Sequence, residues 1–194
     1  MHFRHRHTLW RGLAVGGLAL LMVAVPATAA LGQKAGHHDP AHDVIKRTKK
    51  SDVIAANNKA GDLVHVRFVH TSRRLVTSAR VRDYRGEWHY HGLIKTPTRA
   101  YHVGGEGQGA FSIIGLSTAK GTHDIRCPAL STNIERAKNT ISVSVPTTCL
   151  HRPRWVRTGL IYEWINARGD YFDDALRDSR VLDKPALTRR LYTS

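Results

Sequence analysis

The sequence lacks the motifs by which the common enzyme classes are recognised. It contains no Gly-x-Ser-x-Gly of serine hydrolases, no His-Glu-x-x-His of zinc proteases and no phosphate-binding glycine loop. It also has no pair of carboxylic residues in a setting typical of glycosidases. These absences favour a binding module over an enzyme, so we expect no catalytic residue and no cofactor.

Long hydrophobic runs are also missing. The longest extends from Gly12 to Val25, whereas a transmembrane helix needs about twenty apolar residues. Basic residues precede this run and small residues follow it, which is the pattern of a cleavable secretory signal. Ala27 and Ala29 have the spacing that signal peptidase requires. We therefore predict a signal peptide over residues 1–29 and a secreted product, extracellular or associated with the cell wall.

Cysteine is scarce, since only Cys127 and Cys149 occur. In an exported protein an even pair is most simply a disulfide. The bond would close a loop of about twenty residues and stabilise the fold by about 3 kcal/mol. The alternative, a catalytic thiol, has no nucleophile motif around either residue. No cysteine lies near the predicted cleavage point, so a lipoprotein anchor is not indicated.

Acidic residues are half as frequent as basic ones, and the 15 acidic against 30 basic residues give a formal charge of +15. Loss of the signal peptide would lower the charge to +12 and leave one ordinary domain. A charge of this sign favours anionic partners. The basic residues are scattered in short groups such as 46–50. We therefore expect a cell-wall or other anionic polymer as partner, without specific nucleic-acid recognition, and the oligomeric state stays open.

Long amphipathic helices are not indicated, and a two-residue alternation begins after Gly61. In 63–70 every second residue is apolar, and a second alternating run at 74–83 follows a short connection, which predicts an antiparallel hairpin. Further strands are expected at 88–96, 100–103, 109–116, 139–145 and 155–162, separated by glycine-rich turns, chiefly 104–109. Together they predict an all-β protein, an antiparallel β-sandwich of jelly-roll or immunoglobulin-like type over residues 61–180.

The flanking segments lack this alternation. Residues 30–60 are polar and charged, which predicts a flexible N-terminal segment. Residues 171–178 are compatible with one helical turn or a capping loop. Residues 181–194 form a C-terminal tail with little to hold it.

Several motifs support the same fold by similarity. They are Asp39-Pro40-Ala41-His42-Asp43, the hairpin end Arg82-Asp83, Cys127-Pro128, the stretch 145–157 and Asp173-Asp174-Ala175. In these motifs the chain resembles a group of secreted β-sandwich proteins from actinomycete bacteria, and the Pro-x-x-Cys-Leu-x-x-Pro-x-Trp-Val-Arg stretch is the most specific. The resemblance implies the fold, export and paired cysteines, but no reaction. His42 stands where that pattern has glycine, which argues against a tight turn or cation site around Asp39 and Asp43.

Histidine is the most conspicuous candidate for chemistry. On a strand, His89 and His91 project from one face about 7 Å apart. They could share a zinc or copper ion if a neighbouring strand supplied a third ligand, for which His102 and His65 are candidates. The alternative is a solvent-facing row of polar residues. A metal at His89 and His91 would make the protein an extracellular metal-dependent or hydrolytic enzyme.

Acidic residues near the start of the exported part suggest a different ion. Asp39, Asp43 and Asp52 could hold calcium, as sandwich domains often do near a chain terminus. The intervening histidine, proline and alanine weigh against this interpretation, because a hard cation needs several converging oxygens.

Aromatic residues beside arginines suggest a binding surface. Trp88, Tyr90 and Tyr101, with Arg80 and Arg82, could stack and hold sugar rings or bases on a sheet face. Core packing is the alternative for these rings. The leading hypothesis from sequence is therefore a secreted, non-enzymatic β-sandwich module that binds cell-envelope glycan or an anionic polymer.

Overall fold

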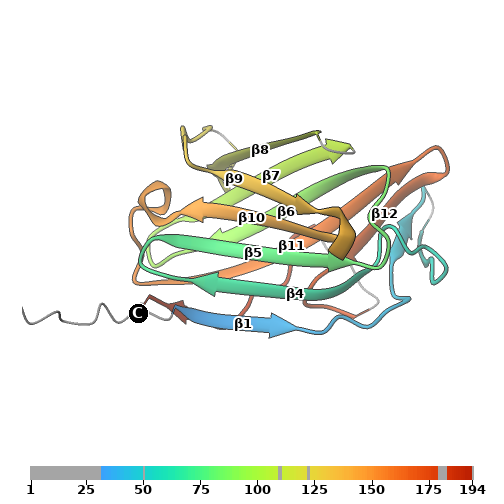
Figure 1. Cartoon of the computed structure of the whole chain (residues 1–194), viewed down its shortest axis with the longest axis horizontal. Coiled ribbons are helices and arrows are strands. Elements are labelled where there is room, and N and C mark those ends of the chain that lie inside the picture. The colour runs from blue at the N-terminus through green and yellow to red at the C-terminus, as the bar shows by residue number, and fades with distance from the viewer. Residues whose placement is uncertain (1–31, 50, 109–110, 122, 179–182, 194) are drawn as a thin grey trace, which may run out of the picture.

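The computed structural model describes residues 32–49, 51–108, 111–121, 123–178 and 183–193. The predicted signal peptide, residues 1–29, lies outside this range. Two antiparallel sheets pack face to face as a β-sandwich (Figure 1), which confirms the predicted fold class. Within the described ranges, no helical segment has the length and apolar character that a membrane crossing requires.

The smaller sheet has five strands in the order β1-β4-β5-β10-β9. Their bounds are β1 (Gln33–His37), β4 (Leu63–His70), β5 (Arg74–Val81), β10 (Thr140–Pro146) and β9 (Ser131–Glu135). β4 and β5 form the hairpin that the alternation predicted, with a register shift between Leu63 and His65. The smaller sheet therefore contains the first strongly alternating part of the sequence.

The larger sheet follows the order β3-β2-β12-β11-β6-β7-β8, and a short strand, β13, pairs with β11. The bounds are β3 (Asp52–Ile54), β2 (Ile45–Arg47), β12 (Gly169–Asp174), β11 (Trp155–Asn166), β6 (Glu87–Lys95), β7 (Ala100–Gln108), β8 (Phe111–Thr118) and β13 (Leu191–Tyr192). Two short 3-10 turns, η1 (Arg136–Lys138) and η2 (Thr147–Leu150), flank β10.

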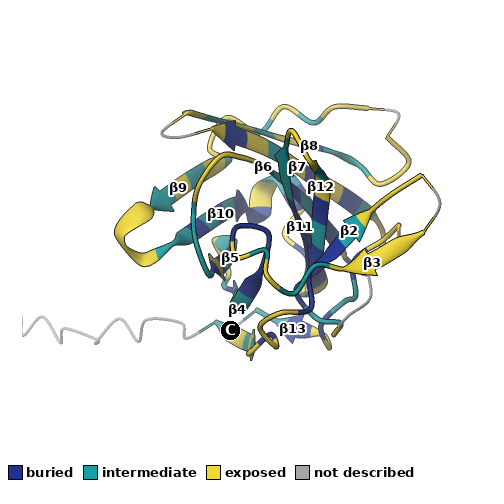
Figure 2. Ribbon diagram, turned by 90° about the vertical axis from the view of Figure 1, so that its right-hand side faces the viewer, coloured by how far each residue is buried: buried dark blue, intermediate teal, exposed yellow. Residues whose placement is uncertain are grey.

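The core lies between the sheets, where the inward side chains of both form one continuous cluster. Phe68 and Ile141 enter it from the smaller sheet, and Trp88, Leu160 and Tyr162 from the larger, all at most 1% exposed. Each such side chain contributes about 1.5–3 kcal/mol through removal from water. Figure 2 shows buried residues alternating with more exposed ones along the strands.

Two local predictions are wrong. The glycine-rich stretch expected to be a turn continues β7 to Gln108. Glycine is needed at Gly107, because a Cβ there would lie 2.5 Å from Cζ2 of Trp88. Residues 171–174, expected as a helical turn or capping loop, belong to β12, which pairs with both β11 and β2.

The flanking segments also need correction. The described part of 30–60, expected to be flexible, contributes β1 to one sheet and β2 and β3 to the other. Its apolar Val44 and Ile45 are buried. The end of the described C-terminal tail is packed as well, since Leu191 is fully buried and its carbonyl oxygen lies 2.8 Å from Nδ1 of His70. A few apolar residues are enough to hold each segment in place.

The cysteine pair confirms the disulfide prediction. Cys127 and Cys149 are bonded, with 22 residues of sequence separation and their Cα atoms 5.8 Å apart. The bond ties the segment before β9 to η2, and both sulfur-bearing residues pack against the core.

Removing this bond should destabilise the fold. We expect the Cys127→Ser/Cys149→Ser variant to lose about 3 kcal/mol of unfolding free energy, because the unfolded chain gains freedom. Urea denaturation of both proteins measures the difference. A loss below about 1 kcal/mol would contradict the structural importance of the bond.

Candidate functional site

A hollow on the outer face of the five-stranded sheet is lined by basic and hydroxyl side chains. It has a volume of about 320 Å³, and we call it the basic hollow; its lining residues are His38, His65, Arg67, Ser78, Arg80 and Thr140. No acidic side chain is among them. The sequence places them outward because their strand neighbours, such as Val66, Ala79 and Ile141, are buried in the core.

Positive charge is concentrated in the basic hollow. His65 lies opposite Arg80 across the β4–β5 pair, and Arg67 lies two residues further along β4, on the same face. The pKa of His65 is lowered, first by partial burial and then by the positive charges of His38, Arg80 and Arg67. The neutral form of the His65 imidazole is therefore favoured, and the two guanidinium groups supply charged donors for an anion.

The predicted aromatic binding surface is wrong. Trp88, Tyr90 and Tyr101 are 1%, 3% and 0% exposed, so none can stack on a ligand. Burial also raises the pKa of Tyr90 to about 12. The cause is strand alternation, which turns Trp88 and Tyr90 into the core and leaves the intervening His89 outside.

The two arginines predicted to bind have different roles. Arg80 is exposed and lines the basic hollow. Arg82 is instead engaged within the fold, where Nη1 forms an ion pair with Oδ2 of the buried Asp62. The prediction of a binding role for Arg82 is therefore wrong, because its charge is already paired.

A second group of polar side chains lies on the outer face of the larger sheet. His89 and His91 share this face as predicted, with ring centroids 6.1 Å apart. The third member is Glu163 of β11, and one ligand atom from each residue lies within 4.8 Å of the other two. Glu163 Oε2 is 2.8 Å from His91 Nε2 and 3.6 Å from His89 Nδ1.

The sequence prediction missed Glu163. The expected strand ended at 162, so the residue that pairs with His89 across β6 and β11 was left out. Of the histidines proposed as third ligand, His65 lies on the other sheet. His102 lines a cavity of about 320 Å³ together with His91 and Glu163.

A third group consists of buried aspartates where the chain crosses between the sheets. Asp39 and Asp43 flank a turn between β1 and β2, and Asp173 lies on β12. One carboxylate oxygen from each lies within 4.8 Å of the others. Their exposures are 6%, 5% and 2%, and the adjacent Asp62 is fully buried. The predicted third member, Asp52, is instead exposed on β3, near Arg47.

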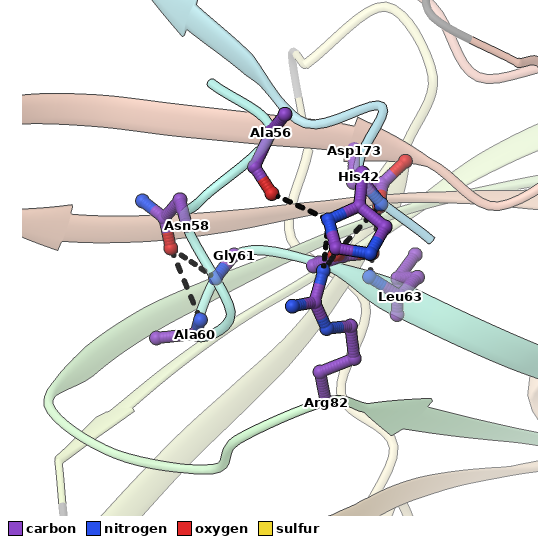
Figure 3. A network of polar contacts seen from close by, with 9 residues as sticks. His42, Ala56, Asn58, Ala60, Gly61, Leu63, Arg82 and Asp173 are labelled. Carbon is purple, nitrogen blue, oxygen red and sulfur yellow. Dashed lines mark hydrogen bonds and ion pairs between the residues drawn. The ribbon is translucent and has the colours of Figure 1, made fainter. Parts of the chain in front are cut away.

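His42 makes the tight turn that brings Asp39 and Asp43 together. Its φ of 81° is in the region that normally favours glycine. Its backbone N–H donates to Asp62 Oδ2 at 3.0 Å, and its ring Nδ1 lies 2.8 Å from the carbonyl oxygen of Ala56 (Figure 3). The expectation that histidine here argues against a tight turn is therefore wrong, because these contacts hold the strained residue in place.

Burial and mutual repulsion dominate the electrostatics of the aspartates. The pKa of Asp39 is raised to about 8, first by burial and then by the charge of Asp43. Burial, followed by the charge of Asp39, raises the pKa of Asp173 well above its ordinary value. This effect is opposed by the backbone N–H of Leu63, which donates to Asp173 Oδ2 at 2.8 Å.

Of the residues proposed from sequence, the structure brings together His89 with His91, Asp39 with Asp43, and the bonded cysteine pair. No protein-family model, curated protein or solved structure matches this chain. Function is therefore inferred from the sites themselves.

The raised pKa of Asp39 predicts how stability depends on pH in the presence of EDTA. Between about pH 4 and pH 8 the folded state keeps a proton that the unfolded state has lost, so this group's contribution to stability falls as pH rises. Asp39→Asn keeps the neutral form at every pH. We expect the variant to be more stable than the wild type at pH 8, on the order of 2 kcal/mol, and nearly equal at pH 5.

Urea denaturation in EDTA at both pH values measures this difference. Asp52→Asn, at an exposed position, is the matched control and should leave the pH dependence unchanged. Parallel pH profiles for Asp39→Asn and the wild type would contradict the raised pKa.

Proposed function

We propose that this protein is a secreted, non-enzymatic β-sandwich module that binds an anionic polymer of the cell envelope through the basic hollow. The observation that carries the proposal is the hollow's lining of two arginines and two histidines without an acidic side chain. Arginine forms charge-assisted hydrogen bonds with phosphate, sulfate and carboxylate groups. A focused positive potential also attracts anionic ligands over a distance.

The spacing of the charges suits a polymer with repeated anionic groups. Arg67 and Arg80 are diagonal neighbours on adjacent strands, which separates their Cβ atoms by about 7 Å. Ser78 lies opposite Arg67, and its hydroxyl oxygen is 2.9 Å from that of Ser142. The basic hollow thus offers charged and hydroxyl donors, and its lining contains no Phe, Trp or Tyr, so recognition depends on charge and hydrogen bonds rather than on stacking against such rings.

Export is part of the same proposal. The n-region, apolar run and alanine spacing in residues 1–29 favour secretion. The disulfide is typical of an oxidising compartment, and the resemblance to secreted actinomycete proteins agrees with this location.

Neutralising the two arginines should weaken binding. We expect Arg67→Ser/Arg80→Ser to bind dextran sulfate and isolated bacterial cell wall about tenfold or more weakly than the wild type, because charge-assisted contacts are lost. Wild-type binding should itself fall as salt rises. Sedimentation with cell wall and titration with dextran sulfate, against uncharged dextran, measure both effects.

The matched control is Arg168→Ser/Arg189→Ser, which removes the same charge from exposed positions outside the basic hollow. It should retain wild-type affinity. Equal losses in the two variants would show that net charge alone drives binding, and failure to bind at any salt concentration would exclude the proposal.

A second candidate function, metal-dependent hydrolysis, is favoured by the position of Glu163. Two imidazoles and one carboxylate are a donor set that zinc accepts. His91 lines two cavities, of about 320 and 280 Å³, which would leave room for water and a substrate beside the ion. Zinc bound there would lower the pKa of a coordinated water and supply a nucleophile.

Metal content separates this candidate from the first. If it is correct, protein purified without chelator should contain about one zinc ion per chain, and His91→Ala should lose it. His123→Ala, at an exposed position on another part of the chain, is the control and should retain the ion. Substoichiometric metal in the wild type by elemental analysis, even after dialysis against zinc, would remove this candidate.

A further inference from the structure

The turn between β1 and β2 carries the chain from the smaller sheet to the larger one. Asp39 and Asp43 lie at its two ends, and Asp173 reaches the same point from β12. Figure 3 shows this crossing, with His42, Arg82 and Asp173 close together around the start of β4. Two separate parts of the chain, the turn and β12, thus place three buried carboxylates together, and we call Asp39, Asp43 and Asp173 the aspartate cluster.

Among the described residues, no arginine or lysine forms an ion pair with Asp39 or Asp173. Arg82 forms an ion pair with Asp62. Among the ion pairs of the described residues, the basic group that contacts Asp39 is His37, whose Nε2 lies 3.7 Å from Oδ1 of Asp39. The side chain of Asp39 is fully buried, yet neither carboxylate oxygen accepts a hydrogen bond from a nitrogen or hydroxyl donor of the described residues. Oδ1 of Asp62 also has no donor. An ionised carboxylate buried in this way is strongly unfavourable without a compensating cation.

We propose that the aspartate cluster binds one Ca²⁺ ion. The donors are carboxylate oxygens, which are the ligands that calcium prefers. Zinc favours nitrogen and sulfur donors, and magnesium usually keeps several of its waters, which a site lined by buried side chains disfavours. Calcium also tolerates irregular geometry, which suits ligands from a turn and a strand.

The ion would have a structural role. It would join the turn of the N-terminal segment to β12 and so hold β1 and β2 on their respective sheets. The same turn includes His38, which lines the basic hollow next to Asp39 in sequence. An ion bound to the aspartate cluster would therefore also fix one wall of the basic hollow. The calcium proposal does not depend on which ligand the hollow binds.

Calorimetry on the wild-type protein, prepared in EDTA and then transferred to chelator-free buffer, tests the proposal. We expect saturable binding of one Ca²⁺ per chain, with a dissociation constant in the micromolar to millimolar range of about 10⁻⁶–10⁻³ M. Calcium at about one hundred times that constant should raise the melting temperature by about 5–10 °C. Equal concentrations of Mg²⁺ or Zn²⁺ should give smaller shifts.

Two variants and one control locate the ion. Asp39→Asn and Asp173→Asn should both lose the calcium-dependent shift, whereas Asp52→Asn should retain it. Asp173 also accepts a hydrogen bond from Leu63, so Asp173→Asn risks a folding defect. Asp39→Asn removes no hydrogen bond from a nitrogen or hydroxyl donor of the described residues and should fold, which keeps the test decisive.

Several results would overturn the proposal. One is a wild-type protein whose melting temperature does not respond to Ca²⁺ up to about ten millimolar, the upper limit for extracellular sites being about one millimolar. This result would mean that a proton shared between Asp39 and Asp173, rather than a cation, neutralises the buried carboxylates. The proposal would also be overturned if calcium still raised the melting temperature of Asp39→Asn. It would be overturned as well if Mg²⁺ or Zn²⁺ raised the melting temperature of the wild type more than Ca²⁺ does. Arg67→Ser/Arg80→Ser should bind calcium normally, which separates this proposal from that for the basic hollow.

Discussion

Side chains on a strand point alternately to opposite faces, and this constraint decides which residues of the sandwich can meet a ligand. On β6 it sends Trp88 and Tyr90 into the core and leaves His89 and His91 outside. On β4 and β5 it buries Phe68 and Ala79 and exposes Arg67 and Arg80. The apolar half of the alternation stabilises the fold, and the polar half forms the two outer faces with their different chemistry.

The outer faces differ in charge because different residues occupy the solvent-facing positions. The five-stranded sheet presents arginine, histidine and hydroxyl groups at the basic hollow. The larger sheet presents histidines close to Glu87, Glu106 and Glu163. The first face suits an anionic ligand and the second a cation. The aspartate cluster belongs to neither face, because it is buried where the chain passes between sheets.

Much of the fold could be predicted from sequence, because the alternation is strong in β4, β5 and β10. Three features could not. β7 contains three glycines, Gly104, Gly105 and Gly107, and glycine has no alternating side chain to reveal a strand. β2 and β3 have only three residues each, too few to show a period. β12 was obscured by its two buried aspartates, of which Asp173 accepts a hydrogen bond from Leu63, 110 residues away in sequence.

The candidate sites were predictable only where their members are close in sequence. His89 and His91 are two residues apart, and Asp39 and Asp43 are four apart, so the sequence shows each pair. Glu163 and Asp173 join them through strand pairing, which a single sequence does not reveal. The aromatic residues were wrongly predicted to form a binding surface. In a strand where aromatic and polar residues alternate, the sequence alone does not show which face is buried, and here the aromatic rings fill the core.

The central claim is that the outer face of the five-stranded sheet is the binding surface. Backbone amide chemical shifts of the protein without residues 1–29, recorded by NMR during titration with dextran sulfate, test it most directly. The account predicts that the perturbed amides lie on β4, β5 and the start of β10, around His65, Arg67 and Arg80. Perturbations confined to β6, β7 and β11, or spread evenly over all exposed lysines and arginines, would contradict it.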